Sequence, residues 1–138
     1  MSLYEYLIRA ENAHRKLVAA EREEKDLSTP IIRDYHQMGE IYNIIQDELA
    51  RKTDIKPNTI EGRRVFIFII IRLCYPAVLV GKKLKKGIRD EIAATLGCEA
   101  SVVSHDLKNL TFQYKKYKSF QRGVDEIFNN VMGYLQEK

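Results

Sequence analysis

Hydrogen-bonding side chains recur at helical spacing in residues 99–108. Ser104 and His105 can donate to or accept from base edges or phosphate groups, while Lys108, one turn beyond Ser104, suits phosphate. The apolar Val102 can contact a thymine methyl group. The chemistry that this segment favours is therefore non-covalent recognition of an anionic polymer, and no bond needs to be made or broken.

These side chains belong to a helix-turn-helix pattern over residues 89–108. Ile92 and Leu96 share one face of a first helix, and Gly97 can adopt the positive φ that ends it. Val103 then begins a second apolar face that would anchor the second helix on the first. In this geometry the N-terminal half of the second helix enters the major groove. It would present Glu99, Ala100, Ser101, Ser104, His105 and Lys108.

The charge of the chain is unevenly divided. The 138 residues carry a formal net charge of +4, from 23 Lys and Arg against 19 Asp and Glu. Residues 63–122 hold thirteen of those bases and four of the acids, a net +9, so the remaining residues carry −5. This division indicates an anionic polymer or surface that only one half meets. Lysines suited to phosphate flank the helix-turn-helix at Lys82, Lys83, Lys85, Lys86, Lys115, Lys116 and Lys118.

The residue types that catalysis or metal binding requires do not cluster in this sequence. Cys74 and Cys98 have no second Cys or His at a ligand spacing, which argues against a zinc site or a disulfide framework. No nucleophile, carboxylate pair or phosphate loop is evident, so we expect neither an enzyme nor a cofactor. The apolar run over 65–80 is broken by Arg72 and Pro76, and the N-terminus lacks a signal-peptide core. A cytoplasmic protein without membrane contact is the expectation.

The elements that must position these residues are all predicted to be helical. In residues 1–56, one apolar stripe runs from Leu3 to Ala20 and a second from Ile31 to Leu49, with Ser28-Thr29-Pro30 as the start of the second helix. Two such stripes predict an N-terminal αα-hairpin, or a pair of seams open to a second subunit. The hairpin would serve as an interface for a homodimer or for another protein partner.

Residues 57–138 are predicted to form the DNA-binding domain. A helix from about Ile60 to Tyr75 is apolar almost all round, although its β-branched residues leave a strand open as the alternative for 65–71. The stretch from Gly81 to Gly87 is predicted to be a loop, Phe112 a core residue, and Phe120 to Leu135 a last helix that closes the core. The fold class is thus all-α, a helical hairpin followed by a helix-turn-helix bundle.

Three stretches within residues 64–135 share a pattern with one known family. They are an apolar helix that ends in arginine, a basic loop, and a Glu-Ile-small-small-small-apolar-Gly segment, here Ile67 to Arg72, Lys82 to Lys86 and Glu91 to Gly97. On these motifs the segment resembles the C-terminal DNA-binding domain of the bacterial replication initiator DnaA. The resemblance implies a Trp-repressor-like helix-turn-helix bundle that reads a short duplex element, with Arg72 entering the minor groove.

The resemblance continues beyond the glycine with several substitutions. Val103 and His105 match the family, and Ser101 replaces a threonine by another hydroxyl. Ala100 and Val102 stand where the family has its base-reading histidine and second threonine, and the sequence has no ATPase phosphate loop. The resemblance therefore implies fold and DNA binding better than a role in initiating replication.

The predicted function is recognition of double-stranded DNA, related to replication or transcription. Its predicted contacts are Arg72, Lys82, Lys83, Lys85, Lys86, Glu99, Ala100, Ser101, Val102, Ser104, His105 and Lys108. Two simpler interpretations stay open: the lysine loop as a solvated connection, and Arg72 as an arginine paired to an acid. The alternative function is a helical interaction module whose basic half binds an acidic protein.

Overall fold

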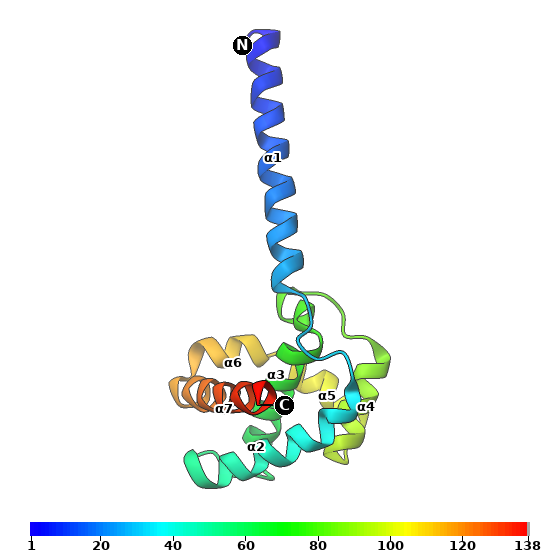
Figure 1. Cartoon of the computed structure of the whole chain (residues 1–138), viewed down its shortest axis with the longest axis vertical. Helices are drawn as coiled ribbons and strands as arrows, with labels where there is room; N and C mark the ends of the chain where they lie inside the picture. The colour runs from blue at the N-terminus through cyan, green and yellow to red at the C-terminus, as the bar shows by residue number, and fades with distance from the viewer. Residues whose placement is uncertain (138) are drawn as a thin grey trace.

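The computed structural model of the chain describes residues 1–137 and confirms the all-α fold class (Figure 1). Within those residues there is no β-strand. The helices are α1 (Leu3–Leu27), α2 (Met38–Lys52), α3 (Ile60–Cys74), α4 (Lys86–Leu96), α5 (Ala100–Leu107), α6 (Leu110–Lys116) and α7 (Lys118–Gln136), with 3-10 helices η1 (Tyr35–Gln37) and η2 (Pro76–Val80).

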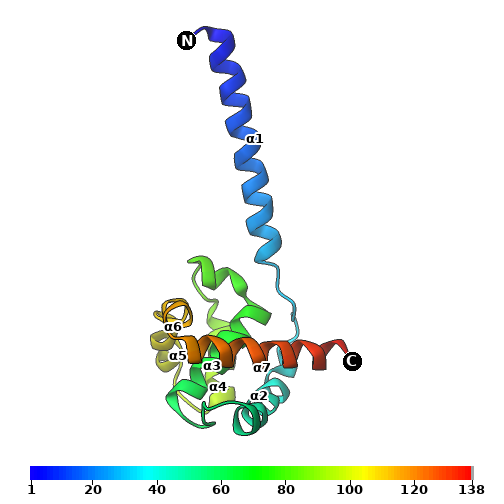
Figure 2. The same cartoon turned by 90° about the vertical axis from the view of Figure 1, so that its left-hand side faces the viewer.

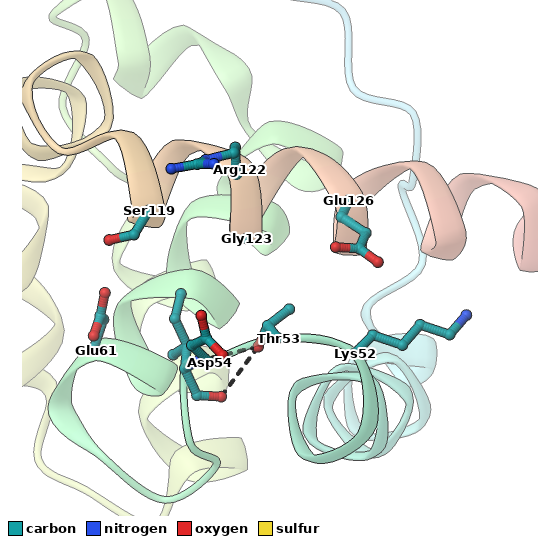
Figure 3. Close-up of a pocket in the computed structure, with 9 residues that line it drawn as sticks. Lys52, Thr53, Asp54, Glu61, Ser119, Arg122, Gly123 and Glu126 are labelled. Atoms are coloured by element: carbon teal, nitrogen blue, oxygen red, sulfur yellow. Dashed lines mark hydrogen bonds between the residues drawn. The ribbon is translucent and has the colours of Figure 1, made fainter.

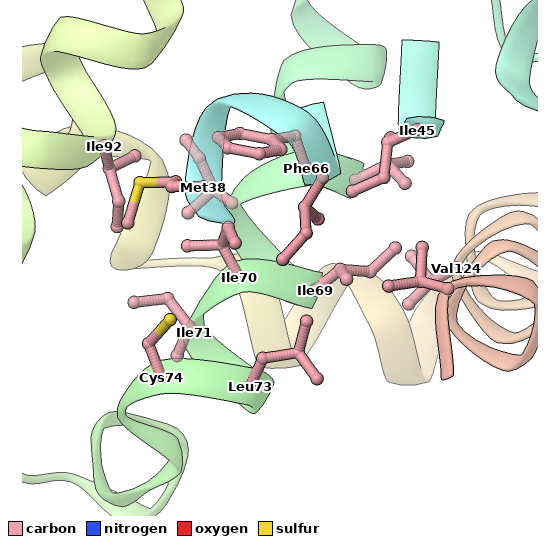
Figure 4. Packing of buried hydrophobic residues seen from close by; sticks show 14 of the residues in the cluster. Met38, Ile45, Phe66, Ile69, Ile70, Ile71, Leu73, Cys74, Ile92 and Val124 are labelled. Carbon is pink, nitrogen blue, oxygen red and sulfur yellow. The ribbon is translucent and has the colours of Figure 1, made fainter. Parts of the chain in front are cut away.

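Helix α3 lies at the centre of a body formed by α2 to α7. Nine of its fifteen residues are buried, as a sequence that is apolar almost all round predicts. Figure 4 shows Phe66 and Ile69 among side chains of α2 and α7, including Ile45 and Val124. The strand alternative for 65–71 is wrong: the segment is helical, and the described chain contains no strand that could pair with it.

The outer helices each turn one apolar stripe toward α3. In α2 the buried residues are Met38, Ile41, Ile45 and Leu49, at the three- and four-residue spacing of one helix face. In α7 they are Phe120, Gly123, Val124, Ile127 and Val131, so the last helix closes the core as predicted. Each fully buried aliphatic side chain contributes about 1.5–3 kcal/mol, which makes this core the main source of stability.

The predicted N-terminal hairpin of residues 1–56 is not what the structure shows. Helix α1 has no buried residue and projects away from the body with its N-terminus at the far end (Figures 1 and 2). Helix α2 instead packs on α3, α4 and α7. The division predicted at residue 57 therefore falls inside a packed body. The physical reason is α2 itself, whose bulky apolar stripe is buried against α3 rather than against the alanine-rich stripe of α1.

The segment between α1 and α2 also differs from the prediction. Pro30 does not start a helix, because the backbone N–H groups of Ile31 and Ile32 both donate to the carbonyl of Leu73, at 2.8 and 2.9 Å, and hold the segment in a non-helical bend. The side chain of Asp34 then caps η1 by accepting from the N–H of His36. This connection fixes the base of α1 to the end of α3.

The start of α3 requires a glycine. Gly62 donates its N–H to the capping hydroxyl of Thr59 at 3.1 Å, and a Cβ at position 62 would lie 2.7 Å from the carbonyl oxygen of Lys56. Gly62→Ala should therefore lower the free energy of unfolding by about 1–3 kcal/mol, measured by urea denaturation. Gly133→Ala is the matched control, since a Cβ there meets nothing within 4 Å and should stabilise α7 by about 0.5–1 kcal/mol. Equal effects of the two substitutions would contradict the steric argument.

Candidate nucleic-acid interface

Two helices, α4 and α5, occupy the segment for which a helix-turn-helix was predicted, residues 89–108. Gly97 has φ 68°, the left-handed conformation that ends α4, and the N–H of Cys98 donates to the carbonyl of Ala93 at 3.0 Å. Both features belong to a glycine-terminated helix end. Helix α5 then begins three residues after Gly97 and packs on α4.

Helix α5 is held by the residues that its apolar spacing predicts. Val103 is fully buried, Leu107 packs against the core, and Leu110 is buried at the start of α6. Ala93 on α4 is 5% exposed, and its small side chain permits the close approach of the two helices. The opposite face of α5 is consequently left to the solvent.

A buried carboxylate gives α5 a second anchor that the sequence prediction missed. Asp106 is 2% exposed and accepts from Arg63 Nε at 2.7 Å and Nη2 at 3.2 Å, and from Arg64 Nε at 3.4 Å. The hydrogen bond to Asp106 raises the pKa of Arg63 above its ordinary value, although burial opposes this. The sequence contained a sign of this anchor. Asp106 lies on the same helix face as the buried Val103, and an acid on a buried face needs a cation partner.

The outward face of α5 carries the predicted base-reading residues. Ser101, His105 and Lys108 are exposed, and they lie about one turn apart along one side of the helix. Ala100, Val102 and Ser104 are half-buried, so they are less available than was predicted.

Arg89 is a candidate contact that the sequence prediction did not include. Its Nη1 lies 3.5 Å from Ser104 Oγ, within hydrogen-bonding distance, and its Nε lies 3.8 Å from a carboxylate oxygen of Asp90. The guanidinium group thus lies next to the outer face of α5 while its side chain is 35% exposed. The Ser104 hydroxyl accepts in this interaction and can still donate its own O–H, so Arg89 adds a second donor beside it for an incoming acceptor.

Glu99 occupies the N-cap position of α5 and is exposed. A carboxylate there interacts favourably with the helix dipole. It also places a negative charge where the helix N-terminus would otherwise attract a phosphate. A phosphate at the N-terminus of α5 would therefore be repelled by Glu99, a residue that the sequence prediction placed in the major groove.

The lysine loop lies between η2 and α4 and presents its charges to solvent. Lys82, Lys83, Lys85 and Lys86 are all exposed, and Lys85 Nζ lies 5.4 Å from the centroid of the Tyr75 ring. The predicted loop over 81–87 is shorter than expected, because α4 already begins at Lys86. Four exposed ammonium groups without a carboxylate among them give this loop a positive surface of the kind that attracts phosphate.

A second group of lysines lies on α6 and at the start of α7. Lys115, Lys116 and Lys118 are exposed there. Along the chain, the first group of lysines precedes the α4–α5 pair and this second group follows it.

The aromatic residues of α6 include one for which the sequence prediction was wrong. Phe112, expected in the core, is 57% exposed, and Lys116 Nζ lies 5.3 Å from its ring centroid. Tyr114 takes the inner position instead, stacked on Phe68 with its hydroxyl donating to Asp125. That hydrogen bond, together with burial, raises the pKa of Tyr114 to about 12.

The contacts that Arg72 makes are with elements other than α5. Its guanidinium carbon lies 5.7 Å from the centroid of the Phe128 ring on α7. It also lines a groove whose walls come from α1 and η2, with Leu79 and Val80 beside it. Stacking on an aromatic ring, rather than an ion pair with an acid, accounts for its half-buried position.

A mixed-charge pocket lies between the α2–α3 connection and α7 (Figure 3). Its lining includes three carboxylates together with the cations Lys52 and Arg122. Within residues 1–137, no three His, Cys, Asp or Glu side chains come together in a group that could hold a metal ion. The pocket thus offers charges of both signs and no arrangement that specifies a reaction.

Comparisons with known proteins give no information on the function of this chain. No protein-family model, curated protein or solved structure matches the chain. Among the helices of residues 1–137, none combines the length and the apolar character needed to cross a bilayer.

Proposed function

We propose that this chain binds double-stranded DNA, with α5 in the major groove and the flanking lysines on the phosphate backbone. One observation supports this most directly. Helices α4 and α5 are joined by a turn at Gly97, and the exposed lysines of residues 82–86 come immediately before this helix pair, with no carboxylate among them. Anchoring of α5 through Val103 and Asp106 leaves its polar face free. This is the combination that helix-turn-helix recognition requires.

The test is fluorescence anisotropy of labelled duplex DNA with the full chain at 50 and 200 mM salt. Backbone contacts by lysine release counterions, so affinity should fall steeply between the two conditions. An electrophoretic shift with a selected pool of random duplexes then gives the preferred sequence. Absence of binding at 50 mM salt would overturn the proposal.

Substitution of His105 separates base reading from backbone contact. His105 is exposed on the outer face of α5. His105→Ala should therefore change sequence preference, with a loss of about 1–3 kcal/mol on the best site and little change on unrelated duplexes. Competition with matched and mismatched duplexes measures this, and uniform weakening on every sequence would contradict it.

Removing the charge of Glu99 should strengthen binding. Because the carboxylate sits at the N-cap of α5, Glu99→Gln should remove repulsion of phosphate and raise affinity for all duplexes about threefold to tenfold at 50 mM salt. Glu126→Gln on α7, also an exposed acid, is the matched control and should change affinity less. Equal gains from both variants would indicate net charge alone.

The resemblance to the replication initiator's domain makes replication or transcription the proposed setting. The alternative function, binding of an acidic protein by the basic half, is favoured by one observation: Phe112 and Tyr117 are 57% and 51% exposed beside Lys116. Exposed aromatic residues are enriched at the centres of protein interfaces. Retention of an acidic polypeptide after nuclease treatment, without retention of DNA, would favour that alternative.

A further inference from the structure

Helix α1 has an apolar seam that the body leaves uncovered. The seam residues recur at alternating intervals of three and four, the 3.5-residue repeat of a coiled coil: Leu3, Tyr6, Ala10, Ala13, Leu17, Ala20, Glu24 and Leu27. Leu3 is 83% exposed, Leu17 55% and Leu27 69%. A lone helix with an exposed apolar stripe is marginal in water, so this seam requires a partner.

The seam continues into a groove at the base of α1. Ala20, Glu24 and Leu27 line it from α1, and Pro76, Leu79 and Val80 line it from η2, with Arg72 at its edge. Figures 1 and 2 show α1 joining the body beside the end of α3. Val80 is 62% exposed, so the groove, like the seam, presents apolar surface. A partner that covers the seam over its full length must also fill this groove.

The charges of α1 are divided between its two halves. Residues 1–16 carry three bases and two acids, whereas residues 17–27 carry two bases and four acids. Two copies aligned antiparallel would place each net positive half against a net negative half. A parallel pair would place the acidic halves side by side, with Glu24 against the partner's Glu24 in the seam, which is unfavourable.

The side-chain sizes along the seam also fit an antiparallel pair. Aligning Leu3 with the partner's Leu27 places Ala13 against the partner's Leu17 at the centre, a small residue facing a large one. Ala10 then faces the partner's Ala20, and Tyr6 faces the partner's Glu24, where a phenol can donate to a carboxylate. The exposed N-terminal residues of each chain, Leu3 and Tyr6, arrive at the groove beside Leu79 and Val80 of the other.

We infer that the partner is a second copy of this chain, bound through an antiparallel α1–α1 coiled coil whose ends fill the two grooves. This replaces the interface expected of an N-terminal hairpin by one made of α1 alone. It also places the two bodies at opposite ends of the coiled coil. The inference is independent of DNA binding and can hold or fail separately.

The oligomeric state of the full chain is the first test. Sedimentation equilibrium should give the mass of two 16.1-kDa chains. Leu17→Glu, on the seam, should weaken association about a hundredfold, because two leucines are lost from each dimer. Val18→Glu introduces the same charge on the adjacent residue, which points away from the seam, and should leave the dimer intact. A monomer at about 100 µM, or a larger assembly, would overturn the inference, as would equal effects of the two variants.

Cysteine cross-linking tests the orientation. In a Cys98→Ser background, which removes the more accessible native thiol, Ala10→Cys and Ala20→Cys chains are oxidised separately and as a mixture. The antiparallel alignment predicts a covalent dimer only in the mixture, since position 10 faces the partner's position 20. Covalent dimers of each variant alone would show parallel pairing and overturn the inference.

Discussion

Alanine at Lys82, Lys83, Lys85 and Lys86 should weaken binding to duplex DNA of every sequence by about a hundredfold or more at 50 mM salt. All four ammonium groups are exposed, and they lie just before and at the first residue of α4, the helix that supports α5. Each phosphate contact contributes about 0.9 to the slope of log K against log [salt], so the slope should fall by up to about 3.6. Anisotropy titrations of one duplex over 50–200 mM salt measure both quantities.

The control removes four lysines elsewhere. Lys16, Lys25, Lys52 and Lys56 are also exposed, but they lie on α1, at the end of α2 and in the α2–α3 connection. Their replacement by alanine changes the net charge by the same amount. If affinity and salt slope fall equally in both variants, long-range attraction explains the binding and the loop makes no specific contacts. Unchanged binding by the loop variant would contradict the proposed interface.

The parts of the fold that could be predicted are those set by local periodicity and backbone chemistry. Gly97 needed a positive φ, and Val103, at helical spacing from Leu107, needed a buried position; both are found in the structure. The apolar sequence of α3 likewise placed it at the centre. These inferences depend on neighbours in sequence, whose relation is fixed by helix geometry.

The wrong predictions concern residues whose positions depend on packing between helices that are distant in sequence. The stripes of α1 and α2 looked like partners, but Ile41, Ile45 and Leu49 bury against α3, and α1 has nothing left to pack on. On α6, Tyr114 lies on the inner side, where it stacks on Phe68, and Phe112 is exposed. Periodicity identifies an apolar face but does not identify its partner.

The candidate site shows the same division. The exposure of Ser101, His105 and Lys108 followed from spacing, whereas the interaction of Ser104 with Arg89 is made between helices and was not foreseen. The resemblance implies that Arg72 enters the minor groove, whereas its ring contact in the structure is with Phe128 on α7. Two of the thirteen bases counted in the basic segment, Arg63 and Arg64, bind Asp106 and do not form part of the free positive surface.

Loss of the Asp106 carboxylate should be the most damaging single charge change in the chain. Asp106→Asn leaves Arg63 and Arg64 without their anion beside a buried position, and should lower the free energy of unfolding by about 2 kcal/mol. The value is below that of a fully buried pair, since the two arginine side chains are 27% and 28% exposed and can turn toward water. Urea denaturation followed by circular dichroism measures it.

Two further variants determine whether Asp106 acts through its charge. Asp90→Asn removes a half-exposed carboxylate whose nearest arginine atom is 3.8 Å away, and should cost less than about 0.5 kcal/mol. Replacing Asp106 by Leu together with Arg63 and Arg64 by Met removes charges of both signs, and should recover part of the stability lost in Asp106→Asn. A free energy of unfolding of Asp106→Asn within 0.5 kcal/mol of that of the unaltered chain would contradict the anchoring role.

If Asp106 anchors α5 as described, the same variant should also bind DNA less tightly, although freeing two arginines makes the surface more positive. Positioning of α5 and net charge then predict opposite changes in affinity, so one titration separates them.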